Sequence, residues 1–140
     1  MGKAVLMSIN RPHTDNIHAG RKTSELRTRP PKLQPPFKVY VYETLKAGGC
    51  GKVVSEWTCH NMTEWCMCMG IPEHLPATGC ISAEDIRLYC DSGRKNITEM
   101  EISDLVVYDH PRELSEFFLT RPPQSWCYVE ENIVRGCYLL

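Results

Sequence analysis

The sequence predicts an α+β protein that is mainly β, with a small β-barrel of five to six strands flanked by two or three short helices. The first observation behind this prediction is size: 140 residues, 42% hydrophobic and 24% charged, fit one globular domain. The second is that the apolar runs are short and are not separated by long helical crossovers, which favours a partly closed barrel over a doubly wound sheet. We therefore expect residues 1–140 to form a single domain.

Strands are predicted where short apolar runs or alternating polarity are bounded by turn residues. The clearest two alternate aromatic and β-branched residues, and the glycines between them predict a hairpin with a long loop. A later strand is expected to be interrupted near Ser103. The predicted strands are Ala4–Ile9, Lys22–Arg29, Phe37–Glu43, Lys52–Cys59, Ile97–Val107 and Trp126–Glu130.

Helices are expected to be short. A helix over Pro12–Ala19 has a proline at its start and a glycine after its end, as helix boundaries prefer. Ser82, followed by acidic residues, predicts the N-cap of a second helix, in which Ile86, Tyr89 and Cys90 would share the buried face. Residues 60–81 are rich in methionine, cysteine, glycine and proline, and are expected to form an irregular, exposed insertion.

Charge is unevenly distributed along the chain. The net charge is −1, so the total says nothing about partners. Residues 1–55 carry ten lysines and arginines against three acids, and residues 56–140 carry six against fourteen. This asymmetry indicates a basic surface that faces an anion, and the alternative is that folding mixes the two halves and cancels the field.

Composition argues against several other classes of protein. No apolar run approaches the roughly 18 residues of a membrane span, and the first residues lack the long apolar stretch of a signal peptide. We expect a cytoplasmic protein with no membrane association and with reduced thiols, a disulfide framework being the alternative. The cysteines and histidines between 59 and 80 lack the spacing of a structural zinc site, and no dinucleotide fingerprint is present. No metal and no cofactor is therefore expected.

The segment Gly20-Arg-Lys-Thr-Ser-Glu-Leu-Arg27 carries the most chemical information. Residues two apart share a face of a strand, so Glu25 and Arg27 would lie together, with Lys22 at the mouth of the strand. A carboxylate between two cations stays ionised, and such a cluster can bind a phosphate or the edge of a base. A partly buried lysine can also act as a base or nucleophile. The alternative is an exposed ladder of ion pairs that contributes little.

These residues resemble the G-x-K-x-x-E-x-R signature of the ASCH family, whose members have a PUA-like β-barrel. The surrounding blocks follow the order found in that family: "SINRPHTDNI" before the signature, then "VYVYET" and "GKVVSEW". Later, "EISDLVVYDHPRELSEF" and "RPPQSWCYVE" are similar to the closing part of small bacterial and phage-borne members. The resemblance covers nearly the whole chain apart from residues 60–81.

The resemblance implies a cleft beside the signature that binds RNA or another nucleic acid. We expect a nucleic-acid-binding or nucleotide-binding protein, with RNA or a modified nucleoside as its partner. The side chains expected to form a basic cleft for this ligand are those of Arg11, Arg21, Lys22, Arg27 and Arg29.

The alternative hypothesis is a small hydrolase that acts on a modified nucleoside or on RNA, with Lys22 and Glu25 as catalytic residues. Some small ASCH proteins are amidohydrolases that remove the acetyl group of N4-acetylcytidine, and others have been described as nucleases. In the deacetylating members a threonine stands three positions after the lysine, where this chain has Glu25. They also use a distal glutamate, for which Glu84 is the candidate here.

Aromatic side chains are the usual partners of unpaired bases. Tyr40, Tyr42 and Trp126 are candidates for that role, although alternating aromatic residues in a strand more often belong to the core. The histidines outside residues 59–80 have no partner spacing and are predicted to lie on the surface: His13, His18 and His110.

Overall fold

The structure is a computed structural model and describes residues 2–131. Six strands form one mixed sheet in the order β2-β5-β4-β3-β1-β6. The β1–β3 pair is parallel and the other neighbours are antiparallel. This confirms the predicted mainly β class. The strands are β1 (Lys3–Ile9), β2 (Ser24–Arg27), β3 (Phe37–Glu43), β4 (Lys52–Trp65), β5 (Ile97–Arg112) and β6 (Trp126–Glu130).

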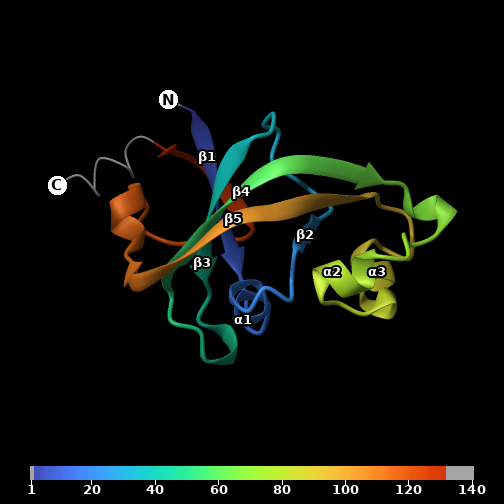
Figure 1. Ribbon diagram of the computed structural model, residues 1–140, viewed down its shortest axis with the longest axis horizontal. Coiled ribbons are helices and arrows are strands. Elements are labelled where there is room, and N and C mark those ends of the chain that lie inside the picture. The colour runs from blue at the N-terminus through green and yellow to red at the C-terminus, as the bar shows by residue number, and fades with distance from the viewer. Residues whose placement is uncertain (1, 132–140) are drawn as a thin grey trace.

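Three short α-helices lie within the described residues, and none is long and apolar enough to cross a membrane. The long strands β4 and β5 run together across the molecule and carry two of the helices at one end, while the third lies beside the middle of the sheet (Figure 1). Single turns of 3-10 helix occur at Lys46–Gly48, Met67–Met69 and Leu114–Phe117. The α-helices are α1 (His13–His18), α2 (Leu75–Gly79) and α3 (Ala83–Tyr89).

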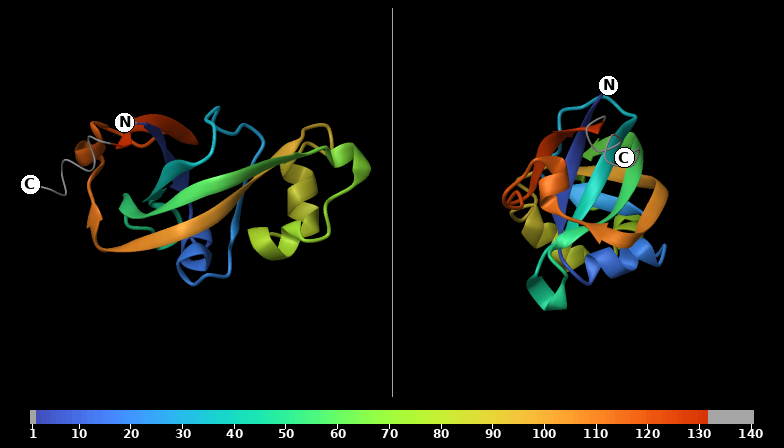
Figure 2. Two further views of the ribbon diagram at one scale, coloured as in Figure 1. Left: turned by 45° about the horizontal axis from the view of Figure 1, so that its top comes forward. Right: turned by 90° about the vertical axis from the view of Figure 1, so that its left-hand side faces the viewer.

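The two edges of the sheet approach each other. Backbone pairing within residues 2–131 leaves β2 and β6 as edge strands, so the hydrogen-bonded order is open. Arg27 of β2 nevertheless donates to the Ser125 hydroxyl, just before β6, and to the carbonyl of Ser8 in β1. The sheet therefore curls so that side chains bridge its open side. Its curvature is visible in the ribbon when it is viewed end-on (Figure 2).

The apolar interior is divided into separate clusters. The first, which we call the main core, packs β1, α1 and the centres of β3 and β4 together, with Val39 and Trp57 fully buried. A second cluster on the other face of the sheet includes Leu6, Tyr40 and Phe117. The third, which we call the outer cluster, lies under α2 and α3, where β4 ends and β5 begins. It consists of Leu26, Met67, Leu75, Ile86, Cys90 and Ile97.

Residues 60–81 were expected to be irregular, and this prediction is wrong because part of the segment forms regular secondary structure. β4 continues to Trp65, and α2 begins at Leu75. Glu99 of β5 explains this order, because its carboxylate accepts hydrogen bonds from the Trp65 indole at 3.0 Å and from Ser24 at 2.6 Å, and lies 2.9 Å from His74 Nε2. One side chain thus ties β2, β4 and the start of α2 together.

Several local predictions are confirmed. Ser82 caps α3 by accepting a hydrogen bond from the backbone N–H of Asp85 at 3.0 Å. The predicted interruption near Ser103 is present only as a change of register against β4, with Asp104 at a φ of 54°, and β5 itself continues to Arg112. The prediction of reduced thiols differs from the structure at one place, where Cys66 and Cys68 form a disulfide beside α2.

Candidate functional site

A cavity of about 630 Å³ lies between the carboxyl end of β1, the strand β2 and the helix α3; we call it the Lys22 cavity. Its walls differ in chemistry. One part presents polar and charged side chains, including those of Asn10, His13, Lys22, Glu25, Arg27 and Thr44. Another part is apolar and includes Leu26, Leu45, Ile81, Ile86 and the ring of Tyr89.

A tight turn after α1 delivers Lys22 to this cavity. Gly20 ends the helix with a φ of +77°, which a residue without a side chain adopts without strain. The backbone N–H groups of Arg21 and Lys22 then both donate to the carbonyl of Asn16, at 2.9 and 3.0 Å. The glycine of the signature is therefore explained by the reversal of the chain between α1 and β2.

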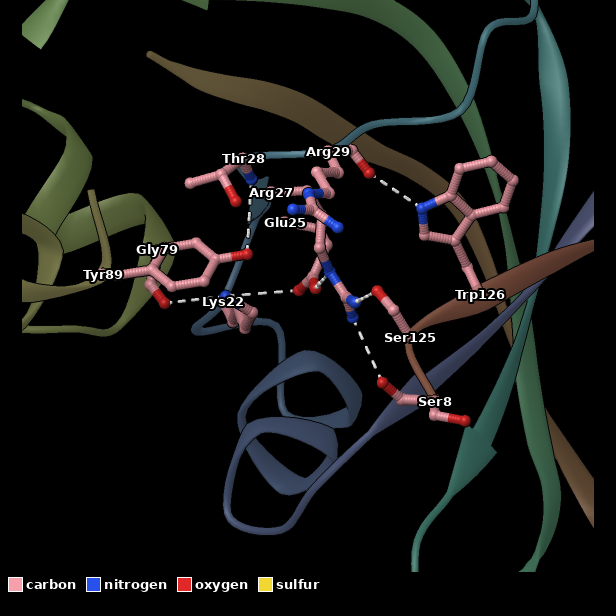
Figure 3. A network of polar contacts seen from close by, with 10 residues as sticks. All are labelled: Ser8, Lys22, Glu25, Arg27, Thr28, Arg29, Gly79, Tyr89, Ser125 and Trp126. Atoms are coloured by element: carbon pink, nitrogen blue, oxygen red, sulfur yellow. Dashed lines mark hydrogen bonds and ion pairs between the residues drawn. The ribbon is translucent and has the colours of Figure 1, made fainter. Parts of the chain in front are cut away.

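Lys22, Glu25 and Arg27 form one buried network (Figure 3). The Lys22 ammonium nitrogen lies 3.5 Å from one oxygen of Glu25, and the Arg27 Nε donates to the other at 2.7 Å. The side chains of Lys22 and Glu25 are 5% and 7% exposed. The spacing of these three residues therefore brings them together as predicted, and burial distinguishes the network from an exposed ladder of ion pairs.

Glu25 is held ionised by its neighbours. Burial alone would raise the pKa of this carboxyl group, but the charges of Arg27 and Lys22 and the hydrogen bond from Arg27 outweigh it, so the pKa lies below its ordinary value of 4.5. Near neutral pH Glu25 is thus a carboxylate that accepts hydrogen bonds. It has no proton to donate to a ligand.

The second partner of Lys22 comes from α2, which the sequence did not predict. The Lys22 ammonium donates to the carbonyl of Gly79 at 2.8 Å. A Cβ at Gly79 would lie 2.8 Å from Cδ1 of Leu26, so a larger residue there would displace the Leu26 side chain or move α2 away from β2. The backbone N–H of Thr23 also donates to the carbonyl of Thr78 at 2.9 Å, which fixes the end of α2 beside the lysine.

His13 is a cavity residue that the sequence placed on the surface. It is the first residue of α1 and lines the cavity with Lys22 and Glu25. Its Nδ1 is buried and has no hydrogen-bond partner among the described residues. Burial and the positive charge of Lys22 lower the pKa of this imidazole, so it is neutral at neutral pH. Its position shortly after the end of β1 could have identified His13 as a cavity residue, because the carboxyl end of β1 forms the rim of the cavity.

The other predicted basic residues do not line the cavity. Arg11, 40% exposed, pairs with Asp15 and donates to the carbonyl of Gly48. Arg21 is exposed and donates to the side chain of Asn16. Arg29 is exposed, and its carbonyl accepts a hydrogen bond from the indole of Trp126. Of the five cations predicted for a cleft, Lys22 and Arg27 converge, while the other three lie outside the cavity lining.

The predicted aromatic residues are mostly part of the core. Tyr40 is 1% exposed, and Trp126 packs beside the main core with its ring edge-on to Tyr128. Tyr42 lines the cavity but is only 5% exposed. Tyr89, predicted to be buried, is instead 44% exposed and lines the cavity.

The candidate for the distal glutamate lies away from the cavity lining. Glu84 is 71% exposed on α3 and pairs with Arg87 at 3.2 Å. Within residues 2–131, no group of three or more histidine, cysteine or acidic side chains is arranged to hold a metal ion. The chemistry that the cavity offers is therefore hydrogen bonding, positive charge and an apolar wall.

Comparison with known proteins gives structural relatives. No family model and no curated protein sequence matches the chain. A crystal structure of an ASCH protein from Zymomonas mobilis superposes with a TM-score of 0.80 at 18% sequence identity, and covers 98% of this chain and 94% of that one. Crystal structures of two single-residue mutants of that protein give TM-scores of 0.78 and 0.77 at 17% and 16% identity, and cover 98% and 97% of this chain and 97% and 94% of theirs. The chain therefore has the fold of ASCH domain proteins.

Proposed function

We propose that the protein binds a nucleotide unit of RNA, or a modified nucleoside, in the Lys22 cavity. The observation that carries this proposal is the buried Lys22–Glu25–Arg27 network inside a cavity of about 630 Å³. Pockets for small ligands typically measure about 300–1,000 Å³ and combine apolar walls with a few fixed polar groups. A nucleobase has matching chemistry, with two apolar faces and a polar edge.

Lys22 is the residue we assign to the polar edge of the base or to a phosphate. An ammonium group has three N–H donors, of which one is directed to the carbonyl of Gly79 and a second is drawn towards Glu25. The remaining donor and the positive charge suit a base oxygen, a ring nitrogen or a phosphate oxygen. Arg27 supports the same site through Glu25, and the exposed Arg11, Arg21 and Arg29 are proposed to contact the phosphates of a longer RNA.

Binding titrations at several salt concentrations test the proposal. We expect short single-stranded RNA to bind less tightly as salt rises, and Lys22→Met and Arg27→Ala to weaken binding further. Lys95→Met is the matched control, because Lys95 is an exposed lysine outside the cavity lining. Thermal unfolding of each variant shows whether it is folded. Tight binding that ignores salt and survives both cavity substitutions contradicts the proposal.

A second candidate function is hydrolysis of a modified nucleoside, with Lys22 and Glu25 in the catalytic roles. It is favoured by the buried pair of opposite charges and by the neutral imidazole of His13 in the same cavity. Because Glu25 is ionised, its role would be that of a base or of an electrostatic partner of Lys22. Mass spectrometry of a panel of acylated nucleosides should show turnover that Lys22→Ala abolishes, and no turnover across the panel argues against this function.

The same evidence supports membership of the ASCH family as a small bacterial or phage-borne member of the PUA-like superfamily, with residues 1–140 as one domain. The fold supports this assignment, and so does the position of Gly20, Lys22, Glu25 and Arg27, the four fixed residues of the signature, around or beside one cavity. A cytoplasmic location follows from the proposed partner, because RNA and its nucleosides are found there.

A further inference from the structure

Tyr89 is an aromatic residue at the end of α3 that is not buried in the core. Its neighbours on α3, Ile86 and Cys90, are fully buried in the outer cluster, which fixes the helix against the sheet. Tyr89 itself remains 44% exposed, with its ring in the wall of the Lys22 cavity. Burial in the core therefore does not account for the ring, which remains accessible from the cavity.

We infer that Tyr89 is the platform on which a single unpaired nucleobase stacks when it enters the Lys22 cavity. The inference rests on the proposed function and adds to it the class of ligand: a base that is free of pairing, in single-stranded RNA or in a free nucleoside. Aromatic rings bind unpaired bases through their faces, while nearby polar groups read the base edge.

A hydrogen bond fixes the position of the Tyr89 ring in the absence of ligand. The backbone N–H of Thr28, directly after β2, donates to the Tyr89 hydroxyl at 3.3 Å (Figure 3). The ring is therefore attached at both ends, through its Cβ to α3 and through its hydroxyl to the end of β2. A stacking surface that is already in place loses little conformational freedom when the ligand binds.

The Tyr89 ring lies near one end of the charged network (Figure 3). Tyr89 lies on the side of Lys22 where Gly79 is found, and Arg27 and Ser125 lie beyond Glu25 on the other side (Figure 3). A base against the ring would thus have its polar edge near the Lys22 ammonium. Ile81, which is partly exposed in the same apolar wall, continues the surface that the ring begins.

The size of the cavity favours one base over a duplex. A paired base has both faces covered by its neighbours in the stack, so it cannot reach the Tyr89 ring until it is unstacked. The other cavity tyrosine, Tyr42, offers no comparable surface because it is 5% exposed.

The test uses RNA that contains the fluorescent base 2-aminopurine, whose emission falls when it stacks on an aromatic ring. We expect the wild-type protein to quench this emission in a single-stranded oligonucleotide and not in the same strand paired with its complement. Tyr89→Ala should lose the quenching and bind roughly 5- to 150-fold more weakly, the range for loss of one stacking contact. Tyr89→Phe, which keeps the ring, should quench as the wild type does.

Leu88→Ala is the matched control, since Leu88 precedes Tyr89 on α3, is 64% exposed and does not line the cavity. Quenching and affinity should be unchanged in this variant. The free riboside of 2-aminopurine distinguishes the two sources of the base: quenching of the riboside assigns the site to nucleosides, and quenching of the oligonucleotide alone assigns it to RNA.

Two failures can be told apart. If the oligonucleotide and the riboside both fail to bind wild-type protein, the proposed function itself is contradicted. If they bind, and binding depends on Lys22 but is the same in Tyr89→Ala as in the wild type, the proposed function stands and the stacking role of Tyr89 is refuted. Equal quenching of single-stranded and duplex RNA refutes the requirement for an unpaired base.

Discussion

The main core and the outer cluster support different walls of the Lys22 cavity. The main core supports the carboxyl end of β1 and the helix α1, and so positions Ser8, Asn10 and His13. The outer cluster supports the apolar wall and holds the Gly79 carbonyl that accepts a hydrogen bond from Lys22. A cavity built at the junction of two packing units depends on both, so damage to either should affect binding in a different way.

The strand β2 joins the two regions through the alternation of its side chains. Leu26 faces the outer cluster, while Glu25 and Arg27 lie on the opposite face and reach Lys22, Ser8 and Ser125. The charged network therefore links the two edges of the open sheet, in addition to the ligand-binding role that we propose for it. Substitutions in β2 and α2 should separate these two roles.

The largest expected effect is that of Glu25→Gln. The change leaves two buried cations without their carboxylate, and removal of one partner from a buried ion pair typically costs about 3–5 kcal/mol. Urea unfolding measures the loss. Glu84→Gln is the control, because the Glu84–Arg87 pair is exposed and should contribute almost nothing. A loss in Glu25→Gln no larger than in the control would mean that the network does not join the two regions.

Leu75→Ala tests the outer cluster alone. Leu75 is fully buried there, and truncation of a buried leucine typically costs about 2–5 kcal/mol. In hydrogen exchange, the amide of Cys90 should lose protection before the amide of Val39 in the main core, because the two clusters pack separately. Equal loss at both amides would show that the clusters unfold as one unit.

Gly79→Ala should be milder and more specific to the site. The added methyl group meets Leu26, and overpacking of this kind typically costs about 1–3 kcal/mol. Where the strain is relieved by a shift of α2, the carbonyl that holds Lys22 moves, and we then expect RNA binding to weaken more than the loss of stability explains. Gly2→Ala, where nothing lies within 4 Å, is the control. Unchanged RNA binding in a destabilised Gly79→Ala variant would show that the contact of Lys22 with α2 is not needed for binding.

The smallest expected effect is a change in how stability depends on pH. The pKa of Glu25 is lowered in the folded protein, so its stabilisation is fully present above the ordinary value of 4.5 and is lost as the pH falls through the lower, folded value. One such group contributes a slope of at most about 1.4 kcal/mol per pH unit. Urea unfolding between neutral pH and about pH 3 should give a flatter slope in Glu25→Gln. Glu43, Glu99 and Glu116, whose pKa values are also lowered, should still contribute to the slope in this variant. An identical slope in both proteins would contradict this assignment.

Local patterns in the sequence predicted the strands of the main core and the charged network. The run Phe37–Glu43 alternates strongly, and the spacing of Glu25 and Arg27 is a property of any strand. In the outer cluster the sequence predicted the face of α3 that carries Ile86 and Cys90, but not α2 or the extension of β4. Contacts distant in sequence order these parts: Glu99 holds Trp65 and His74, which lie 34 and 25 residues away. The role of Gly79 and the exposure of Tyr89 depend on that packing, so neither residue could be assigned from the sequence alone.

A crystal structure of the protein with a bound nucleoside monophosphate tests the central claim most directly. We expect the base to enter the cavity, with its edge within hydrogen-bond distance of the Lys22 ammonium and one face against the ring of Tyr89. A nucleotide bound on another surface, with the cavity around Lys22 left unchanged, would contradict it.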